Sequence, residues 1–230
     1  QAGSDLSKVR STAEPEDDGS YRITGQKIFI TYGDHEMTSN IVHLVLARTP
    51  DAPDGIKGIS LFIVPKFVVN ADGTPGERND VKCVSLEHKL GIHGSPTAVL
   101  SFGDNGGAKG YLVGHKGHGL ACMFTMMNNA RLAVGQQGVA ISERAYQQAV
   151  SYARDRKQGK SPTTGQDESI IHHGDVQRML IRMRSTAEAA RALSLYAAAQ
   201  LDIAHHHEDE NERTKAQTRA NLLIPMVKGW

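Results

Sequence analysis

The feature that most constrains the fold is a change of composition near residue 118. Of the 23 Gly residues, 17 lie in the first 119 positions with six of the eight Pro, whereas six of the seven Met and 17 of the 24 Ala follow. Gly and Pro punctuate turns, while Ala and Met favour helices. The sequence therefore predicts an α+β chain, with a β-rich domain over residues 1–117 and a helical domain over residues 118–230.

The first domain contains short apolar runs separated by turn clusters rich in Asp, Asn, Gly and Pro. Strands at this spacing, with no helices between them, are typical of an antiparallel β-barrel or sandwich. The expected strands cover residues 21–31, 41–48, 58–64, 81–88, 97–102 and 111–113.

In the second domain, apolar residues recur at the helical period. The pattern predicts a long helix from residue 120 to about residue 156 and a second from residue 176 to about residue 204, with a break over residues 159–165. A third helix is expected from residue 212, bent or ended by Pro225. Long antiparallel helices indicate a helical bundle.

Charge and cysteine content argue against several classes of protein. The 26 Lys and Arg nearly balance the 25 Asp and Glu, which removes the simplest argument for binding nucleic acid or an anionic membrane. The uncharged stretch over residues 117–130 is too short and too polar to span a bilayer. Two cysteines far apart, Cys83 and Cys122, predict no disulfide framework and a reducing, cytoplasmic location. Because the chain starts at Gln1 and stops inside a predicted helix, we expect it to be a piece of a longer protein.

One strand combines an aromatic ring with a hydroxyl group. If side chains alternate along residues 27–31, Phe29 and Thr31 share one face of the strand. A ring beside a hydroxyl suits a flat heteroaromatic partner. The pattern alone favours the simpler interpretation, in which Phe29 is an ordinary core residue and Thr31 an ordinary strand residue.

Two arginines on the first long helix invite both a structural and a functional interpretation. Arg131 lies among apolar residues and needs a partner, which is either a ligand carbonyl or phosphate or a structural carboxylate. Arg156 lies in a basic helix end, which suits either interaction with the helix dipole or a phosphate clamp. The histidines at residues 172–173 and 205–207 lack the spacing of a metal site, so no metal is predicted.

Taken in order, seven segments resemble the acyl-CoA dehydrogenase family of flavoproteins, in a larger-subunit branch indicated by residues 67–81 and 172–175. The ordered series extends over nearly the whole chain. The segments are residues 1–6 (QAGSDL), 25–31 (GQKIFIT), 58–65 (GISLFIVP), 87–91 (EHKLG), 117–120 (GHGL), 128–131 (NNAR) and 152–156 (YARDR).

The resemblance implies a middle β-domain followed by the first helices of an incomplete C-terminal four-helix bundle, without the family's N-terminal helical domain. It implies FAD-dependent α,β-dehydrogenation of an acyl-CoA thioester, with hydride transfer to flavin N5. Electrons would leave to an electron-transfer flavoprotein, and the enzyme would be a homodimer or homotetramer. The general-base Glu is expected beyond Trp230, so the 230-residue chain is expected to be inactive by itself.

The family's site residues carry over to particular positions of this sequence. Thr31 would lie near flavin N5, while Arg156 and Gln158 would reach the diphosphate or adenosine of FAD across a subunit interface. The residues implied for FAD are Gln1, Ala2, Gly3, Ser4, Phe29, Ile30, Thr31, Arg156 and Gln158. The residues implied for acyl-CoA are Ser4, Asn128, Asn129, Ala130 and Arg131.

Three departures from the family pattern concern this site. Phe29 stands where Trp is common, which keeps an aromatic face without an indole N–H donor. Asn128 stands where several relatives have Asp. The stretch over residues 157–160 lacks the aromatic residue that usually follows the basic pair.

Other functions share this scaffold. An acyl-CoA oxidase would differ by letting oxygen reach the reduced flavin, and an alkylation-response flavoprotein would bind DNA. Residues 118–230 hold 14 Lys and Arg against 11 Asp and Glu, which gives no basic stripe for DNA. A degenerate structural paralogue is the remaining alternative.

Overall fold

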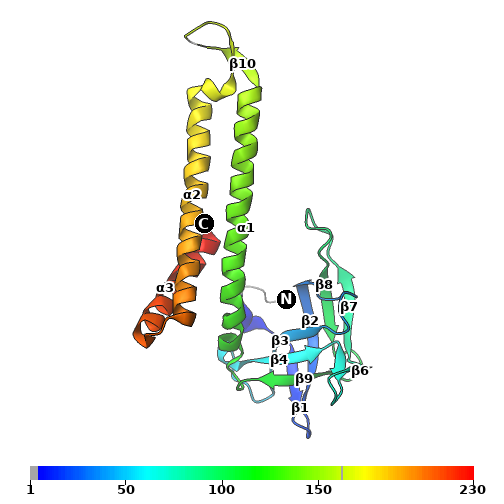
Figure 1. Ribbon diagram of the computed structural model, residues 1–230. Coiled ribbons are helices and arrows are strands. Elements are labelled where there is room, and N and C mark those ends of the chain that lie inside the picture. Colours follow the sequence, from blue (N-terminus) through cyan, green and yellow to red (C-terminus); the bar gives the residue numbers. More distant parts are fainter. Residues whose placement is uncertain (1–4, 162) are drawn as a thin grey trace. The chain divides into compact units, whose positions relative to one another are not determined.

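The strands come first and the long helices follow, so the predicted α+β fold class is confirmed (Figure 1). The computed structural model describes residues 5–161 and 163–230. The chain divides into two compact units, Gln1–Thr125 and Met126–Trp230, and the division falls inside the first long helix. The first unit includes the start of that helix because Leu120, Cys122 and Met123 pack against residues of the strands.

The first unit is built on a seven-stranded sheet in the order β1-β3-β4-β9-β2-β8-β7. An additional β1–β2 pairing closes β1, β3, β4, β9 and β2 into a ring, from which β8 and β7 extend. Among the described residues of this unit, the pairings are antiparallel except for the β1–β3 bridge, and β5 and β6 form a separate hairpin. The strands are β1 Thr12–Pro15, β2 Tyr21–Thr31, β3 Val42–Arg48, β4 Ile59–Pro65, β5 Phe67–Val69, β6 Pro75–Arg78, β7 Val81–Leu86, β8 Thr97–Phe102 and β9 Ala108–Val113.

Alternation along the strands produces the core of this unit. Tyr21 and Ile23 of β2 are buried with Leu100 and Phe102 of β8, whereas the residues between them in sequence face outward or lie half-buried. The Tyr21 ring lies 5.0 Å from the ring of the fully buried Phe62. Burying aromatic side chains of this size contributes strongly to the stability of the β-unit.

A second cluster seats the first turn of helix α1 (Gly119–Asp155) on the strands. It contains the buried Leu46, Ile59 and Leu61. A Cβ atom on Gly119 would lie 2.5 Å from the backbone carbon of Ser60, so only glycine allows the helix to start this close to β4.

The second unit contains the rest of α1, α2 (Gly174–His206) and α3 (Glu210–Gly229). A short hairpin of β10 (Lys157–Lys160) and β11 (Asp167–Ser169) connects α1 with α2 (Figure 1). Of the two alternatives expected at Pro225, a bend or an end of the third helix, the end is wrong, since α3 continues to Gly229. Buried Ile224 and Val227 hold that last turn in place, which offsets the lost hydrogen bond. Among the described residues, no helix has both the length and the apolar character needed to cross a membrane.

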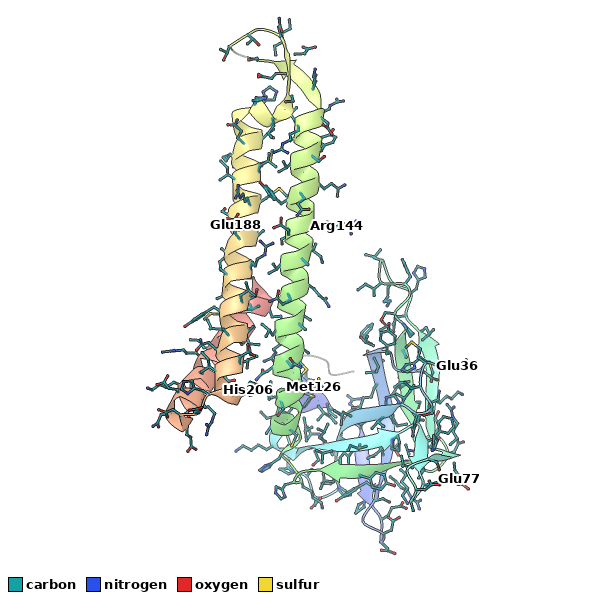
Figure 2. The ribbon with its side chains drawn as sticks, viewed as in Figure 1. Glu36, Glu77, Met126, Arg144, Glu188 and His206 are labelled. Atoms are coloured by element: carbon teal, nitrogen blue, oxygen red, sulfur yellow. The ribbon has the colours of Figure 1, made fainter. Side chains whose placement is uncertain are left out.

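Small residues let the helices of the second unit approach one another. Ala187 and Ala197 of α2 and Ala216 and Ala220 of α3 are buried. An ion pair of 2.7 Å between Glu143 of α1 and Arg191 of α2 adds a polar contact. Figure 2 shows other charged side chains midway along these helices, such as Arg144 on α1 and Glu188 on α2; the exposed Glu188 accepts a hydrogen bond from Arg184.

Helix α1 meets α3 at Gly135, where a Cβ atom would lie 2.4 Å from Val227 Cγ1 and 3.0 Å from its carbonyl oxygen. We therefore expect Gly135→Ala to lower the free energy of unfolding by about 1–3 kcal/mol, as overpacking does. Gly138→Ala is the matched control, because a Cβ atom there has open space. It should raise stability by about 0.5–1 kcal/mol through helix propensity. Urea unfolding followed by circular dichroism measures both changes, and equal effects would contradict the close approach.

Candidate functional site

The far end of β2 carries a β-bulge. Lys27 pairs with Leu100 and Ile30 pairs with Ala98, so the two residues between Lys27 and Ile30 face a single residue of β8. Phe29, one of the two, has a φ of 59°, in the left-handed region that side chains other than glycine rarely adopt. Bulges re-aim side chains and often lie beside functional sites. The strict alternation of side chains expected along residues 27–31 therefore does not hold.

The bulge presents the aromatic ring and the hydroxyl group on the surface. Phe29 is 65% exposed and Thr31 is exposed as well, while Ile30 between them packs against the core. Phe29 is therefore not a core residue of the described chain. Both groups that the sequence suggested for a flat heteroaromatic ligand are available at the same strand end.

A turn held together by Lys89 supports Thr97, the residue of β8 that pairs with Thr31. Thr31 pairs with Thr97 of β8, and the Lys89 ammonium donates 3.0 Å to Thr97 Oγ1. The same ammonium donates to the carbonyl oxygens of Ser95 and Ile92, at 2.5 and 2.9 Å. Lys89 thus fixes the segment that precedes β8. Lys89 lies in the family-like segment at residues 87–91, but its role is not visible in the sequence because its acceptors are mostly backbone atoms.

On α1, two of the candidate acyl-CoA residues lie together. Asn128 and Arg131 are half-buried, and Arg131 Nη1 donates 3.3 Å to Asn128 Oδ1. Residues three apart on a helix share a face. Asn129 and Ala130 are exposed. The arginine therefore has an amide oxygen among its partners.

After α1, Arg156 and Gln158, the two candidate residues for the diphosphate or adenosine of FAD, also lie together. Arg156 Nη2 donates 3.1 Å to Gln158 Oε1, and both side chains are exposed. The Arg156 carbonyl accepts from the Ile170 amide, and His173 Nε2 lies 2.8 Å from the Gln158 carbonyl oxygen. Backbone contacts anchor this segment, on which the guanidinium and the amide lie together, whereas the sequence pattern predicted a break between helices over residues 159–165.

The remaining candidate residues, Gln1, Ala2, Gly3 and Ser4, lie outside the described residues. Within the described ranges, no group of three or more His, Cys, Asp or Glu side chains is placed to hold a metal ion.

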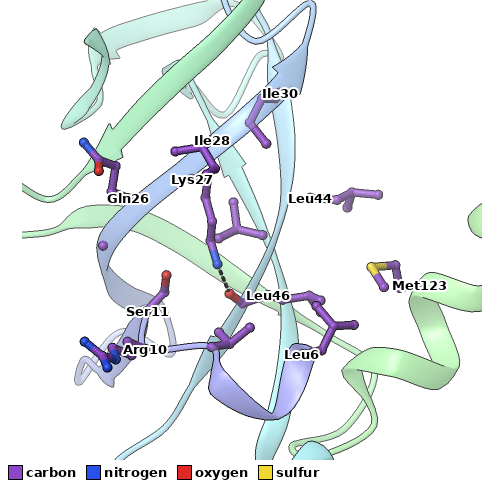
Figure 3. A pocket seen from close by; sticks show the side chains of 13 residues that line it. Leu6, Arg10, Ser11, Gln26, Lys27, Ile28, Ile30, Leu44, Leu46 and Met123 are labelled. Atoms are coloured by element: carbon purple, nitrogen blue, oxygen red, sulfur yellow. Dashed lines mark hydrogen bonds between the residues drawn. The ribbon is translucent and has the colours of Figure 1, made fainter. Parts of the chain in front are cut away.

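A hollow of about 400 Å³ lies between β2 and β3 (Figure 3). We call it the seam hollow, because it occupies the gap between these two strands. Its walls are mostly apolar, with a few polar groups on one side. It is lined by Leu6, Val9, Arg10, Ser11, Gly25, Gln26, Lys27, Ile28, Ile30, Leu44, Val45, Leu46 and Met123. The sequence gives no sign of it, since it depends on which strands pair.

Lys27 is the polar side chain that reaches across this gap. Its ammonium donates 2.8 Å to the Leu46 carbonyl oxygen (Figure 3). Burial lowers the pKa of Lys27 from 10.5 to about 8. Arg10 is the other basic residue of the lining. A neighbouring hollow of about 280 Å³ shares Lys27 and contains His43, whose pKa is also lowered by burial.

The candidate site residues lie in two regions of the chain, each of which matches a known domain family. Residues 1–105 match the model for "Acyl-CoA dehydrogenase, middle domain", and residues 117–221 match that for "Acyl-CoA dehydrogenase, C-terminal domain". The chain belongs to the acyl-CoA dehydrogenase family. The bulge and Phe29 lie in the middle-domain region of this family, while Asn128, Arg131 and Arg156 lie in the C-terminal-domain region.

Individual relatives agree with this assignment. The chain is 57% identical to "3-methylmercaptopropionyl-CoA dehydrogenase" of Ruegeria pomeroyi. It is 44% identical to a "Butyryl-CoA dehydrogenase" of Syntrophomonas wolfei. Each alignment covers 100% of the chain and 39% of the relative, so the chain spans about two fifths of the relatives' length. The solved butyryl-CoA dehydrogenase from Megasphaera elsdenii matches with a TM-score of 0.66 at 27% identity, over 96% of this chain and 50% of that one.

The depressed pKa of Lys27 makes stability depend on pH. Between pH 8 and 10.5, unfolded chains bind this proton more often than folded ones, so stability should rise as pH increases. The difference between the pKa values of Lys27 in the unfolded and folded chain corresponds to a free energy of about 3 kcal/mol. In Lys27→Met, the rise in the free energy of unfolding across this range should be smaller by about 2–3 kcal/mol.

Urea unfolding at a series of pH values measures this difference. Lys82→Met, which changes an exposed lysine of β7, is the control and should keep the wild-type pH profile. An unchanged profile in Lys27→Met would show that the Lys27 ammonium carries no burial penalty.

Proposed function

We propose that the whole protein is a FAD-dependent acyl-CoA dehydrogenase, which introduces an α,β double bond into an acyl-CoA thioester. The observation that carries this proposal is the bulged end of β2, where a strained backbone presents Phe29 and Thr31 outward. The alignment of the whole chain with parts of two acyl-CoA dehydrogenases supports the proposal.

The residues of the bulged end fit a flavin ring. An exposed aromatic face offers contact area to a flat heteroaromatic system, and a neighbouring hydroxyl offers a hydrogen bond to a ring nitrogen. Phe29 would lie against the ring and Thr31 near N5. When bound, FAD supplies the acceptor for the β-hydrogen, and the protein contributes binding, orientation and electrostatics.

Arg156 and Gln158 fit the diphosphate end of FAD. A guanidinium is well suited to phosphate oxygens, and the Gln158 amide oxygen lies within hydrogen-bond distance of it. Because the family resemblance assigns these residues to a flavin in the neighbouring subunit, the proposal includes a homodimer or homotetramer.

Asn128 and Arg131 would orient the acyl-CoA through its polar groups, with Asn129, Ala130 and Ser4 along the same passage. Proton removal at the α-carbon needs a carboxylate, which we place in a segment beyond Trp230. The developing enolate oxygen also needs hydrogen-bond donors, because the thioester carbonyl must be polarised. Electrons would then pass to an electron-transfer flavoprotein. We propose short acyl groups as substrates, since the names of both dehydrogenase relatives denote short acyl groups.

The visible spectrum of the purified full-length protein tests this function. We expect flavin absorbance bands that bleach when butyryl-CoA or 3-methylmercaptopropionyl-CoA is added without oxygen. Slow reoxidation in air would support a dehydrogenase, whereas rapid reoxidation would indicate an acyl-CoA oxidase. A bound flavin that no acyl-CoA bleaches would favour a DNA-binding flavoprotein or a degenerate paralogue, and failure to bind FAD would overturn the proposal.

The role of Thr31 is tested separately from turnover. Thr31→Val keeps the shape of the side chain and removes the hydroxyl, so FAD affinity should fall by about fivefold, the value of one neutral hydrogen bond. Thr12→Val, at an exposed position of β1, is the matched control and should leave the affinity unchanged. Titration of the apoprotein with FAD gives both dissociation constants. Equal constants for the two variants would remove Thr31 from the flavin contacts.

A further inference from the structure

The seam hollow lies between two strand edges that have no strand partner among the described residues. Strand β3 pairs with β4 along its length but with β1 only at Arg48. Beyond Gly25, β2 pairs with β8 and no longer with β1 or β9. The gap is therefore a consequence of strand topology, and its volume lies within the range of about 300–1,000 Å³ that is usual for small-molecule sites.

One half-buried charge, the Lys27 ammonium, dominates the chemistry of this gap. An ammonium has three donors, and that of Lys27 uses one of them on the Leu46 carbonyl oxygen. In the described part of the chain, no carboxylate lines the hollow and no other acceptor lies within hydrogen-bond distance of this ammonium. A charge in apolar surroundings is costly unless it is paired. The lowered pKa of Lys27 has this origin.

We propose that the seam hollow binds a free aliphatic monocarboxylate. The carboxylate accepts hydrogen bonds from Lys27 Nζ, and the aliphatic chain lies along Leu44, Leu46 and Met123 (Figure 3). The site differs in composition from the proposed acyl-CoA contacts, none of which is among its described lining residues.

The shape and charge of the hollow favour this class of ligand over others. A thioester is neutral and leaves the ammonium without a counter-charge. A phosphate carries more charge and is strongly hydrated, so it suits clustered exposed arginines better than apolar walls. A monocarboxylate neutralises one ammonium and buries its chain. The neighbouring hollow shares Lys27, Ile30, Leu44 and Val45, which leaves room for the chain to extend.

Calorimetric titration of the purified full-length protein with decanoate tests the proposal at neutral pH. Decan-1-ol and decyltrimethylammonium provide the same chain with no charge and with the opposite charge. We expect decanoate to bind about tenfold or more tightly than decan-1-ol, as a hydrogen bond between charged groups predicts. Decyltrimethylammonium should bind weakest. Equal binding of the three compounds, or no binding of decanoate, would overturn the proposal.

Three variants locate the site. Lys27→Met should abolish the preference for decanoate over decan-1-ol, whereas the exposed control Lys82→Met should preserve it. Leu44 is 50% exposed, so Leu44→Trp is compatible with folding and should fill the hollow, weakening both ligands while Lys27 remains. Wild-type decanoate affinity in Lys27→Met or in Leu44→Trp would place the ligand elsewhere, for example among the acyl-CoA contacts. Thermal unfolding of each variant confirms that the titrated protein is folded.

Discussion

Strand β2 determines most of what is distinctive in the β-domain, because it is hydrogen-bonded to β1, β9 and β8. Its first residues complete the ring of strands, and the strand leaves that ring at Gly25. There φ is 140°, and a Cβ atom would lie 2.6 Å from Ser11 Oγ. The bulge at Phe29 follows directly. Both the exposed aromatic end and the seam hollow result from this single departure from the ring.

Sequence patterns predicted the elements whose signal is local. The bounds of β2 and β8 agree with the apolar runs, because alternation and flanking turns define a half-buried strand. The four-residue β1 and the β5–β6 and β10–β11 hairpins were missed, since short polar strands exist only through their pairing partners. Pro225 illustrates tertiary packing that overrides a local rule.

The candidate site shows the same division between local and long-range information. The contact between Asn128 and Arg131 follows from helical spacing, and the family resemblance singled out both residues. The roles of Lys27 and Lys89 were not visible, because their acceptors are mostly backbone carbonyl groups brought close by strand order and turn geometry. The partial burial of the Lys27 ammonium depends on strand topology rather than on a local motif.

The unpaired edge of β3 has a consequence for how the protein avoids misassembly. Val42 and Leu44 are 57% and 50% exposed on an edge that, within the described part of the chain, lacks a strand partner there. Such an edge invites a strand from another molecule to add to the sheet. A charged side chain pointing into such a gap opposes this addition, because an entering strand would have to bury the charge without compensation. The Lys27 ammonium, which donates to the Leu46 carbonyl oxygen across this gap, is therefore expected to disfavour the addition of another strand at the β3 edge.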